Sequence, residues 1–191
     1  MAAAAGRVHP LLRSILRSDY GSVDPAIPAM VKLLSDRGAD ECWHKHSTFG
    51  QHLAGVWRIM ALWGQRPSAC RAGLCHSAYS NSYVNLMIFD EANPSDRKTV
   101  TELLGTEAEE TIRTWCSINR RAEVVDRLLA LSDDNPGDLE RQLAHGLEVA
   151  NLRTGRALRL GPRQVGELLV FEMADAADQQ FGWQVRERVA S

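Results

Sequence analysis

Apolar residues recur every three or four positions along most of this chain, which is the spacing of one face of an α-helix. No stretch alternates convincingly with the period of two that a half-buried strand requires. The fold class we expect is therefore all-α, a single helical bundle over residues 25–191 preceded by an N-terminal segment, 1–24, that is flexible or a short helix. The stripes predict helices at 25–37, 48–63, 68–79, 99–104, 107–118, 139–152 and 164–180, with shorter apolar segments at 9–17 and 122–131.

Turn-forming residues set the expected ends of these helices. Asp24 and Ser47 are residue types that cap helix N-termini, and Gly38, Gly64 and Gly105 follow apolar runs as helix-ending glycines do. Three further stretches interrupt the periodicity, so we expect connections there: 80–96, which mixes aromatic and β-branched residues with turn formers, 133–138 (DDNPGD) and 154–163 (TGRALRLGPR).

Composition narrows the function classes. The 191 residues carry 22 Lys+Arg against 24 Asp+Glu, a net charge of −2, which argues against non-specific nucleic-acid binding through many phosphate contacts. The longest uncharged run, 72–89, contains a histidine, serines and asparagines that a bilayer core excludes, so we expect no membrane span. The four cysteines form no CxxC pair and are expected to be reduced thiols. A cytoplasmic location follows, with an organellar transit peptide in the Ala- and Arg-containing start as the alternative.

Three polar side chains fall on apolar helix faces. His52 shares a face with Val56 and Ile59, His76 lies among the small residues of 69–75, and Asp175 lies on the stripe of 168 and 171. A buried carboxylate must be paired, protonated or bound to a cation. Taken singly, each residue has an ordinary structural interpretation, such as a core histidine donating to a carbonyl. Taken together, imidazole and carboxylate are ligands that Mn, Fe and Zn accept, so a divalent metal site is a hypothesis.

Three short motifs add a family resemblance. H-L-x-G-V at 52–56, A-G-L-C-H-S at 72–77 and M-A-D-A-A-D-Q at 173–179 resemble the HD-domain superfamily of metal-dependent phosphohydrolases. Within it the pattern is most similar to the hydrolase domain of the (p)ppGpp enzymes. The stretch 44–182 also resembles an uncharacterised HD-like family of plants, algae and bacteria. The resemblance implies an HD-like helical fold, with His52, His76 and Asp175 as metal ligands.

The chain departs from the superfamily at Ser77. The residue after the second histidine in those enzymes is an aspartate that ligates the metal, and here it is a hydroxyl. His46 is the substitute ligand that we consider, with a capping or exposed role in the cluster C-W-H-K-H as its rival. That cluster lacks the second Cys/His pair of a zinc finger.

A second departure concerns acid–base catalysis. The (p)ppGpp hydrolases carry a Glu-Asp pair soon after the HD, whereas this chain has no carboxylate there until Asp90 and Glu91. Those two residues and Glu172 are our candidates for the proton acceptor. Lys45, Arg120 and Arg121 are candidates for holding a small phosphorylated substrate, a nucleotide or another phosphate ester.

Three alternatives to a phosphohydrolase stay open. One is an HD-type oxygenase with iron in the same ligands, and another is an HD-like module that has lost catalysis, with Ser77 as the visible change. The third is a helical interaction domain in which the tryptophans are core and interface residues: Trp43, Trp57, Trp63, Trp115 and Trp183. Substrate, metal identity and oligomeric state are not encoded in any motif of the sequence.

Overall fold

The computed structural model describes residues 9–45, 47–81, 86–134 and 136–189. Helices dominate these residues, as the apolar stripes predicted, and they are joined by two small antiparallel hairpins. In chain order the elements are α1 (Leu12–Leu16), η1 (Tyr20–Ser22), α2 (Ile27–Asp36), β1 (Trp43–His44), β2 (Ser47–Thr48), α3 (Phe49–Leu62), α4 (Pro67–Leu74), α5 (Pro94–Leu104), α6 (Thr106–Ser117), η2 (Arg121–Asp126), α7 (Arg127–Asp134), α8 (Pro136–His145), β3 (Leu147–Ala150), β4 (Ala157–Leu160) and α9 (Pro162–Val189).

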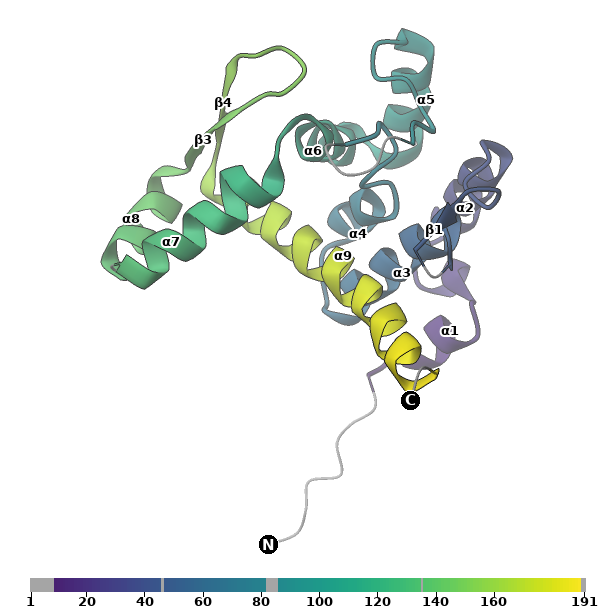
Figure 1. Ribbon diagram of the computed structural model, residues 1–191. Helices are drawn as coiled ribbons and strands as arrows, with labels where there is room; N and C mark the ends of the chain where they lie inside the picture. The colour runs from purple at the N-terminus through teal and green to yellow at the C-terminus, as the bar shows by residue number, and fades with distance from the viewer. Residues whose placement is uncertain (1–8, 46, 82–85, 135, 190–191) are drawn as a thin grey trace, which may run out of the picture.

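Helix α3 is the centre of the bundle. It packs against α4 on one side and against the long helix α9 on another, while α2 and both strands of the first hairpin also contact it. Figure 1 shows α9 running diagonally past α3 and α4, so that segments more than a hundred residues apart in the chain lie side by side. This packing brings one face of α9 against the face of α3 that carries His52.

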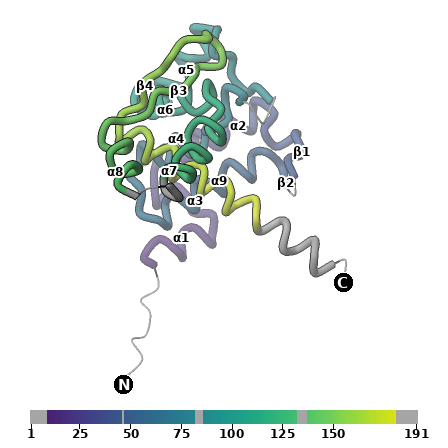
Figure 2. The backbone as a smooth tube through the Cα atoms, turned by 60° about the vertical axis from the view of Figure 1, so that its left-hand side comes forward, coloured from purple at the N-terminus to yellow at the C-terminus, as the bar shows by residue number. Residues whose placement is uncertain are grey.

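The remaining elements flank this centre. Helices α5 and α6 pack on each other and on α4, and the elements from η2 to β4 form a group that α9 joins to the rest. Figure 2 shows α7, α8 and the β3–β4 hairpin on one side of the molecule and the β1–β2 hairpin on the opposite side.

The tryptophans divide between core and surface. Trp57 and Trp115 are among the largest fully buried side chains, whereas Trp43 is 71% exposed and Trp63 44% exposed. The side chain of Trp183 lies outside the described residues. Trp57 and Trp115 are therefore core residues, whereas Trp43 and Trp63 lie at the surface.

Helix α3 begins with a reciprocal cap. The Thr48 hydroxyl accepts a hydrogen bond from the N–H of Gln51, and the Gln51 side chain accepts one from the N–H of Thr48. Thr48, rather than Ser47, is thus the cap. At α2 the cap position belongs to Ala26, and Asp24 instead accepts from the N–H of Ala26 in the turn before the helix.

Two elements that we expected to be helix or loop are strands. The predicted helix over 139–152 ends at His145, because Gly146 adopts a left-handed φ of +80° and turns the chain. Leu147 and Val149 then face the core as strand β3, which pairs with β4 inside the stretch 154–163 that we expected to be a loop. Over four residues, alternation is too short to distinguish from a helical stripe.

Two further elements have boundaries that differ from those expected from the sequence. The expected helix 68–79 ends at Leu74, and residues 75–78 continue as successive turns, so His76 lies in a turn rather than on a helix. The expected loop 133–138 contains the end of α7 and the start of α8, with residue 135 outside the described part.

The N-terminal residues that the structure describes pack on the bundle. Ile15 of α1 is buried, and Arg71 of α4 donates two hydrogen bonds to the Asp24 carboxylate at 2.7 and 2.8 Å. None of the helices in the described residues combines the length and the apolar character that a membrane span requires.

Candidate metal centre

Three elements each deliver one buried side chain to a common point. His52 comes from α3, His76 from the turn after α4, and Asp175 from α9. One potential ligand atom of each residue lies within 4.8 Å of those of the other two, and each residue is at most 7% exposed. The packing of α3 against both α4 and α9 is what closes this triangle. The convergence expected of the three residues is therefore confirmed.

Both imidazoles are oriented with Nε2 toward the centre. His76 Nδ1 lies 2.8 Å from the carbonyl oxygen of Gly73, and His52 Nδ1 lies 2.8 Å from Oδ2 of Asp178. For His76 this acceptor places the ring proton of the neutral form on Nδ1 and leaves the lone pair on Nε2. His52 has a carboxylate at each ring nitrogen, and the shorter contact, to Asp178, favours the same tautomer. The Nε2 atoms of His52 and His76 lie 3.2 and 3.9 Å from Oδ1 of Asp175.

These separations fit a shared cation. Two ligand atoms that are each about 2.1 Å from a tetrahedral Zn²⁺ lie about 3.4 Å apart, and the two separations to Asp175 lie on either side of that value. Two imidazoles and one carboxylate, with positions left open, are a donor set that suits Zn²⁺ and Fe²⁺. The residues present therefore fit a divalent metal ion, although its identity is not fixed by them.

Burial and charge give the two histidines opposite protonation. Burial lowers the pKa of His76 to about 4, so this ring is neutral at physiological pH. Burial also disfavours the charged form of His52, but its hydrogen bonds to Asp175 and Asp178 outweigh that effect and raise the pKa of His52 to about 8. The pKa of Asp175 is lowered, because the contacts to His52, His76 and Arg120 outweigh its burial. The metal-free centre thus holds a proton on His52 beside an ionised carboxylate.

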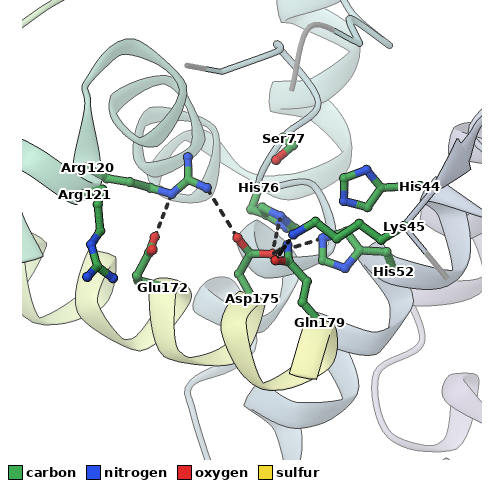
Figure 3. A pocket seen from close by; sticks show the side chains of 10 residues that line it. All are labelled: His44, Lys45, His52, His76, Ser77, Arg120, Arg121, Glu172, Asp175 and Gln179. Atoms are coloured by element: carbon green, nitrogen blue, oxygen red, sulfur yellow. Dashed lines mark hydrogen bonds and ion pairs between the residues drawn. The ribbon is translucent and has the colours of Figure 1, made fainter. Parts of the chain in front are cut away.

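A polar cavity of about 210 Å³ opens beside the triad. Figure 3 shows its lining: Lys45 and Gln179 lie on one side of Asp175, and Arg120 and Glu172 lie on the other. Arg120 links the carboxylates, with Nε 2.7 Å from Glu172 Oε2 and Nη2 3.3 Å from Asp175 Oδ2. Its guanidinium also stacks on the buried ring of Trp115 at 4.2 Å.

The structure brings the three predicted substrate-binding residues to this cavity. Lys45, Arg120 and Arg121 all line the cavity, and Lys45 donates a hydrogen bond to the side-chain oxygen of Gln179. Arg121 is more than half exposed and pairs with Asp126, so it lies at the edge. Glu172 lines the cavity too, so of the three acid–base candidates it is the one that lies beside the triad.

Asp90 and Glu91 do not line this cavity. Asp90 accepts a hydrogen bond from the N–H of Ala92, and Glu91 pairs with Arg113 at 3.1 Å and with Arg153. Both carboxylates therefore bind partners around the loop before α5, and neither reaches the cavity beside the triad.

Ser77, the residue after His76, carries a hydroxyl beside the triad. Ser77 is buried and lines the cavity, and its hydroxyl accepts a hydrogen bond from Asn81 at 2.7 Å. His46, our candidate replacement, lies outside the described residues. His44, two positions earlier, does line the cavity, and its ring centre is 4.9 Å from that of His52.

Sequence reasoning missed three residues of the site: His44, Asp178 and Gln179. The signal for the last two was available, because Asp178 and Gln179 follow Asp175 by three and four positions and so share its helix face. Gln179 Nε2 donates to Asp175 Oδ1 at 2.6 Å. His44 lies in strand β1, whose two residues are too few for periodicity to reveal.

Comparison with known proteins gives a limited match. Residues 33–120 match a family model described as Domain of unknown function (DUF6817). This span is less than half of the chain; it includes His52, His76 and Arg120 and stops before Asp175. No curated protein and no solved structure matches the chain.

Proposed function

We propose that this protein is a metal-dependent phosphohydrolase that acts on a small phosphate ester or nucleotide. The observation that carries the proposal is the convergence of two imidazole Nε2 atoms and a carboxylate oxygen, all on buried residues. They lie beside a polar cavity that is also lined by basic side chains. The resemblance of the motifs around His52, His76 and Asp175 to the HD superfamily favours the same reaction class.

The cavity suits an anionic substrate. Three basic side chains line it, Lys45, Arg120 and Arg121, against the two carboxylates of Glu172 and Asp175. A divalent ion bound by the triad would make the balance more positive. Arg120 is held rigidly, by two carboxylates and by Trp115, so its positive charge is fixed at the cavity wall, where it favours an anion.

The roles of the residues follow from their positions. His52, His76 and Asp175 would hold the ion, which when bound supplies a water of lowered pKa and polarises a phosphoryl oxygen. Glu172 lies one helical turn from Asp175 at the cavity wall and is the residue that would accept the proton of the attacking water. Lys45 and Arg120 would bind the phosphate and orient it.

Phosphate release tests the proposal. Purified protein is incubated with Mn²⁺, Fe²⁺ or Zn²⁺ and a panel of nucleotides and small phosphate esters. We expect release that His76→Ala abolishes without loss of helicity by circular dichroism. His145→Ala is the matched control, because His145 is exposed on α8 and bonds to a backbone carbonyl of its own helix. A metal-loaded protein that releases no phosphate from any member of the panel contradicts the proposal.

The ligand set favours a second candidate, an iron-dependent oxygenase. With Ser77 in place of an aspartate, the centre consists of two histidines and one carboxylate, the set that non-haem Fe(II) oxygenases use. Oxygen uptake by the Fe²⁺-loaded protein, with no phosphate release, would favour this candidate. Absence of both activities together with absence of bound metal would leave a helical module without catalysis.

A further inference from the structure

His52 lies between two carboxylates of the same helix. Asp175 and Asp178 are three residues apart on α9, so both project toward α3, and the His52 ring lies between them. Asp175 approaches Nε2 at 3.2 Å and Asp178 approaches Nδ1 at 2.8 Å. Asp178 is therefore at the edge of the ring that faces away from the centre.

A glycine of α3 makes room for this carboxylate. Gly55 follows His52 by three residues, which places it next to His52 on the same helix face. The carboxylate of Asp178 occupies the space that a Cβ at position 55 would take. A glycine inside a helix costs roughly 0.5–1 kcal/mol relative to alanine, so its presence at this buried position has a specific steric reason.

We propose that Asp178 is the positioning residue of the metal centre and that Gly55 is the residue that lets it reach His52. The Asp178 carboxylate accepts a hydrogen bond from Nδ1–H of His52, so the neutral ring keeps its lone pair on Nε2, the atom that faces His76 and Asp175. The tautomer of His52 is a property of the metal-free protein and does not depend on the proposed function. The effect of Asp178 on metal binding rests on that function.

Of the two histidines, only His52 has a side chain as the acceptor for its Nδ1, so Asp178 is the residue to substitute. His76 directs its Nε2 in the same way, but its anchor is the backbone carbonyl of Gly73, which no side-chain substitution removes. Asp178 is the anchor that a single substitution can change. Its oxygens lie away from the centre, since Oδ2 is hydrogen-bonded to the far edge of the His52 ring and Oδ1 lies against Gly55.

The direct experiment observes the tautomer. Histidine labelled with ¹⁵N gives separate signals for protonated and unprotonated ring nitrogens, recorded on metal-free protein at a pH near 9, where His52 is neutral. We expect wild-type His52 to be the Nδ1–H tautomer. Asp178→Asn and Gly55→Ala should each convert it to a mixture with the Nε2–H form. Asp36→Asn and Gly166→Ala are the matched controls, because Asp36 is an exposed acid and Gly166 a helical glycine with open space at its Cβ.

Metal affinity gives the second measurement. Titration with Co²⁺, followed by its visible spectrum, should show affinity reduced about 10- to 100-fold in Asp178→Asn and in Gly55→Ala, the loss typical when the partner of a ligating histidine is removed. The two control variants should bind Co²⁺ as the wild type does.

The outcomes separate this inference from the proposed function. If both variants keep the Nδ1–H tautomer and wild-type Co²⁺ affinity, the role of Asp178 is overturned while the metal centre stands. If wild-type protein binds no Co²⁺, the proposed function fails, and the tautomer in metal-free protein still decides the role of Asp178. If neither variant folds, the wild-type spectrum decides it, since an Nε2–H tautomer of His52 overturns the inference.

Discussion

Metal binding at this centre should release a proton, and the number released should depend steeply on pH. The metal-free protein keeps a proton on His52 up to the raised pKa of about 8, because Asp175 and Asp178 lie 3.2 and 2.8 Å from its ring nitrogens. The ion requires the Nε2 lone pair, so that proton must leave. His76 is already neutral above its lowered pKa of about 4 and contributes no proton in the neutral range.

The magnitude follows from the pKa of His52. His52 should release about one proton at pH 6.5 and about a quarter of a proton at pH 8.5, and its deprotonation alone should raise the apparent affinity about 25-fold between them, or about 2 kcal/mol. A histidine with the ordinary pKa of about 6.5 would give only about a twofold rise. The difference between a 25-fold and a twofold rise in affinity therefore reports how far Asp175 and Asp178 raise the pKa of His52.

Calorimetry in buffers of different ionisation enthalpy counts these protons directly. Zn²⁺ or Co²⁺ is titrated into the protein at each pH, and the slope of the observed enthalpy against the buffer enthalpy gives the number released. A slope near zero at pH 6.5, or an affinity that rises only about twofold, would refute the assignment of a charged His52 between Asp175 and Asp178. His145→Ala again serves as the control and should leave the slope unchanged.

Three further predictions concern stability. Arg71→Met should lower the free energy of unfolding in urea by about 2 kcal/mol, since it removes two hydrogen bonds to the buried carboxylate of Asp24. Arg71 lowers the pKa of Asp24, so this difference should be full above about pH 4 and disappear as the pH falls through that lowered pKa; an unchanged difference in acid would contradict the assignment. Zn²⁺ at about 100 times its dissociation constant should stabilise the protein by about 2.7 kcal/mol in thermal unfolding, and His76→Ala should lose that gain. Gly105→Ala should destabilise by about 1 kcal/mol, because the φ of +86° between α5 and α6 strains any residue with a Cβ; an unchanged melting temperature would refute this.

The sequence predicted which side chains converge better than which carboxylates reach the cavity. His52 and Asp175 lie inside apolar stripes, and a polar residue in such a stripe must face the core, so convergence could be inferred from spacing. Asp90 and Glu91 lie in a loop, where no periodicity fixes the direction of a side chain. The structure directs them to local partners and leaves Glu172, on α9, at the cavity.

The β3–β4 hairpin shows where hydrophobic periodicity does not predict secondary structure. Strand β3 has four residues, of which Leu147 and Val149 are buried, and the same apolar positions also fit a helix face. Its identity is fixed by pairing with β4 across a turn, which is a contact between two segments and not a property of either one.

The chain by itself determined that most of its segments are helical and which polar side chains point inward, since both depend on residues within a few positions of each other. The tertiary structure decided how near those side chains lie and which ring nitrogen faces the centre. His52 and Asp178 are 126 positions apart, and only the packing of α9 on α3, across the missing Cβ of Gly55, brings them to 2.8 Å. A contact between distant segments depends on the geometry of both helices at once, and neither local sequence encodes it.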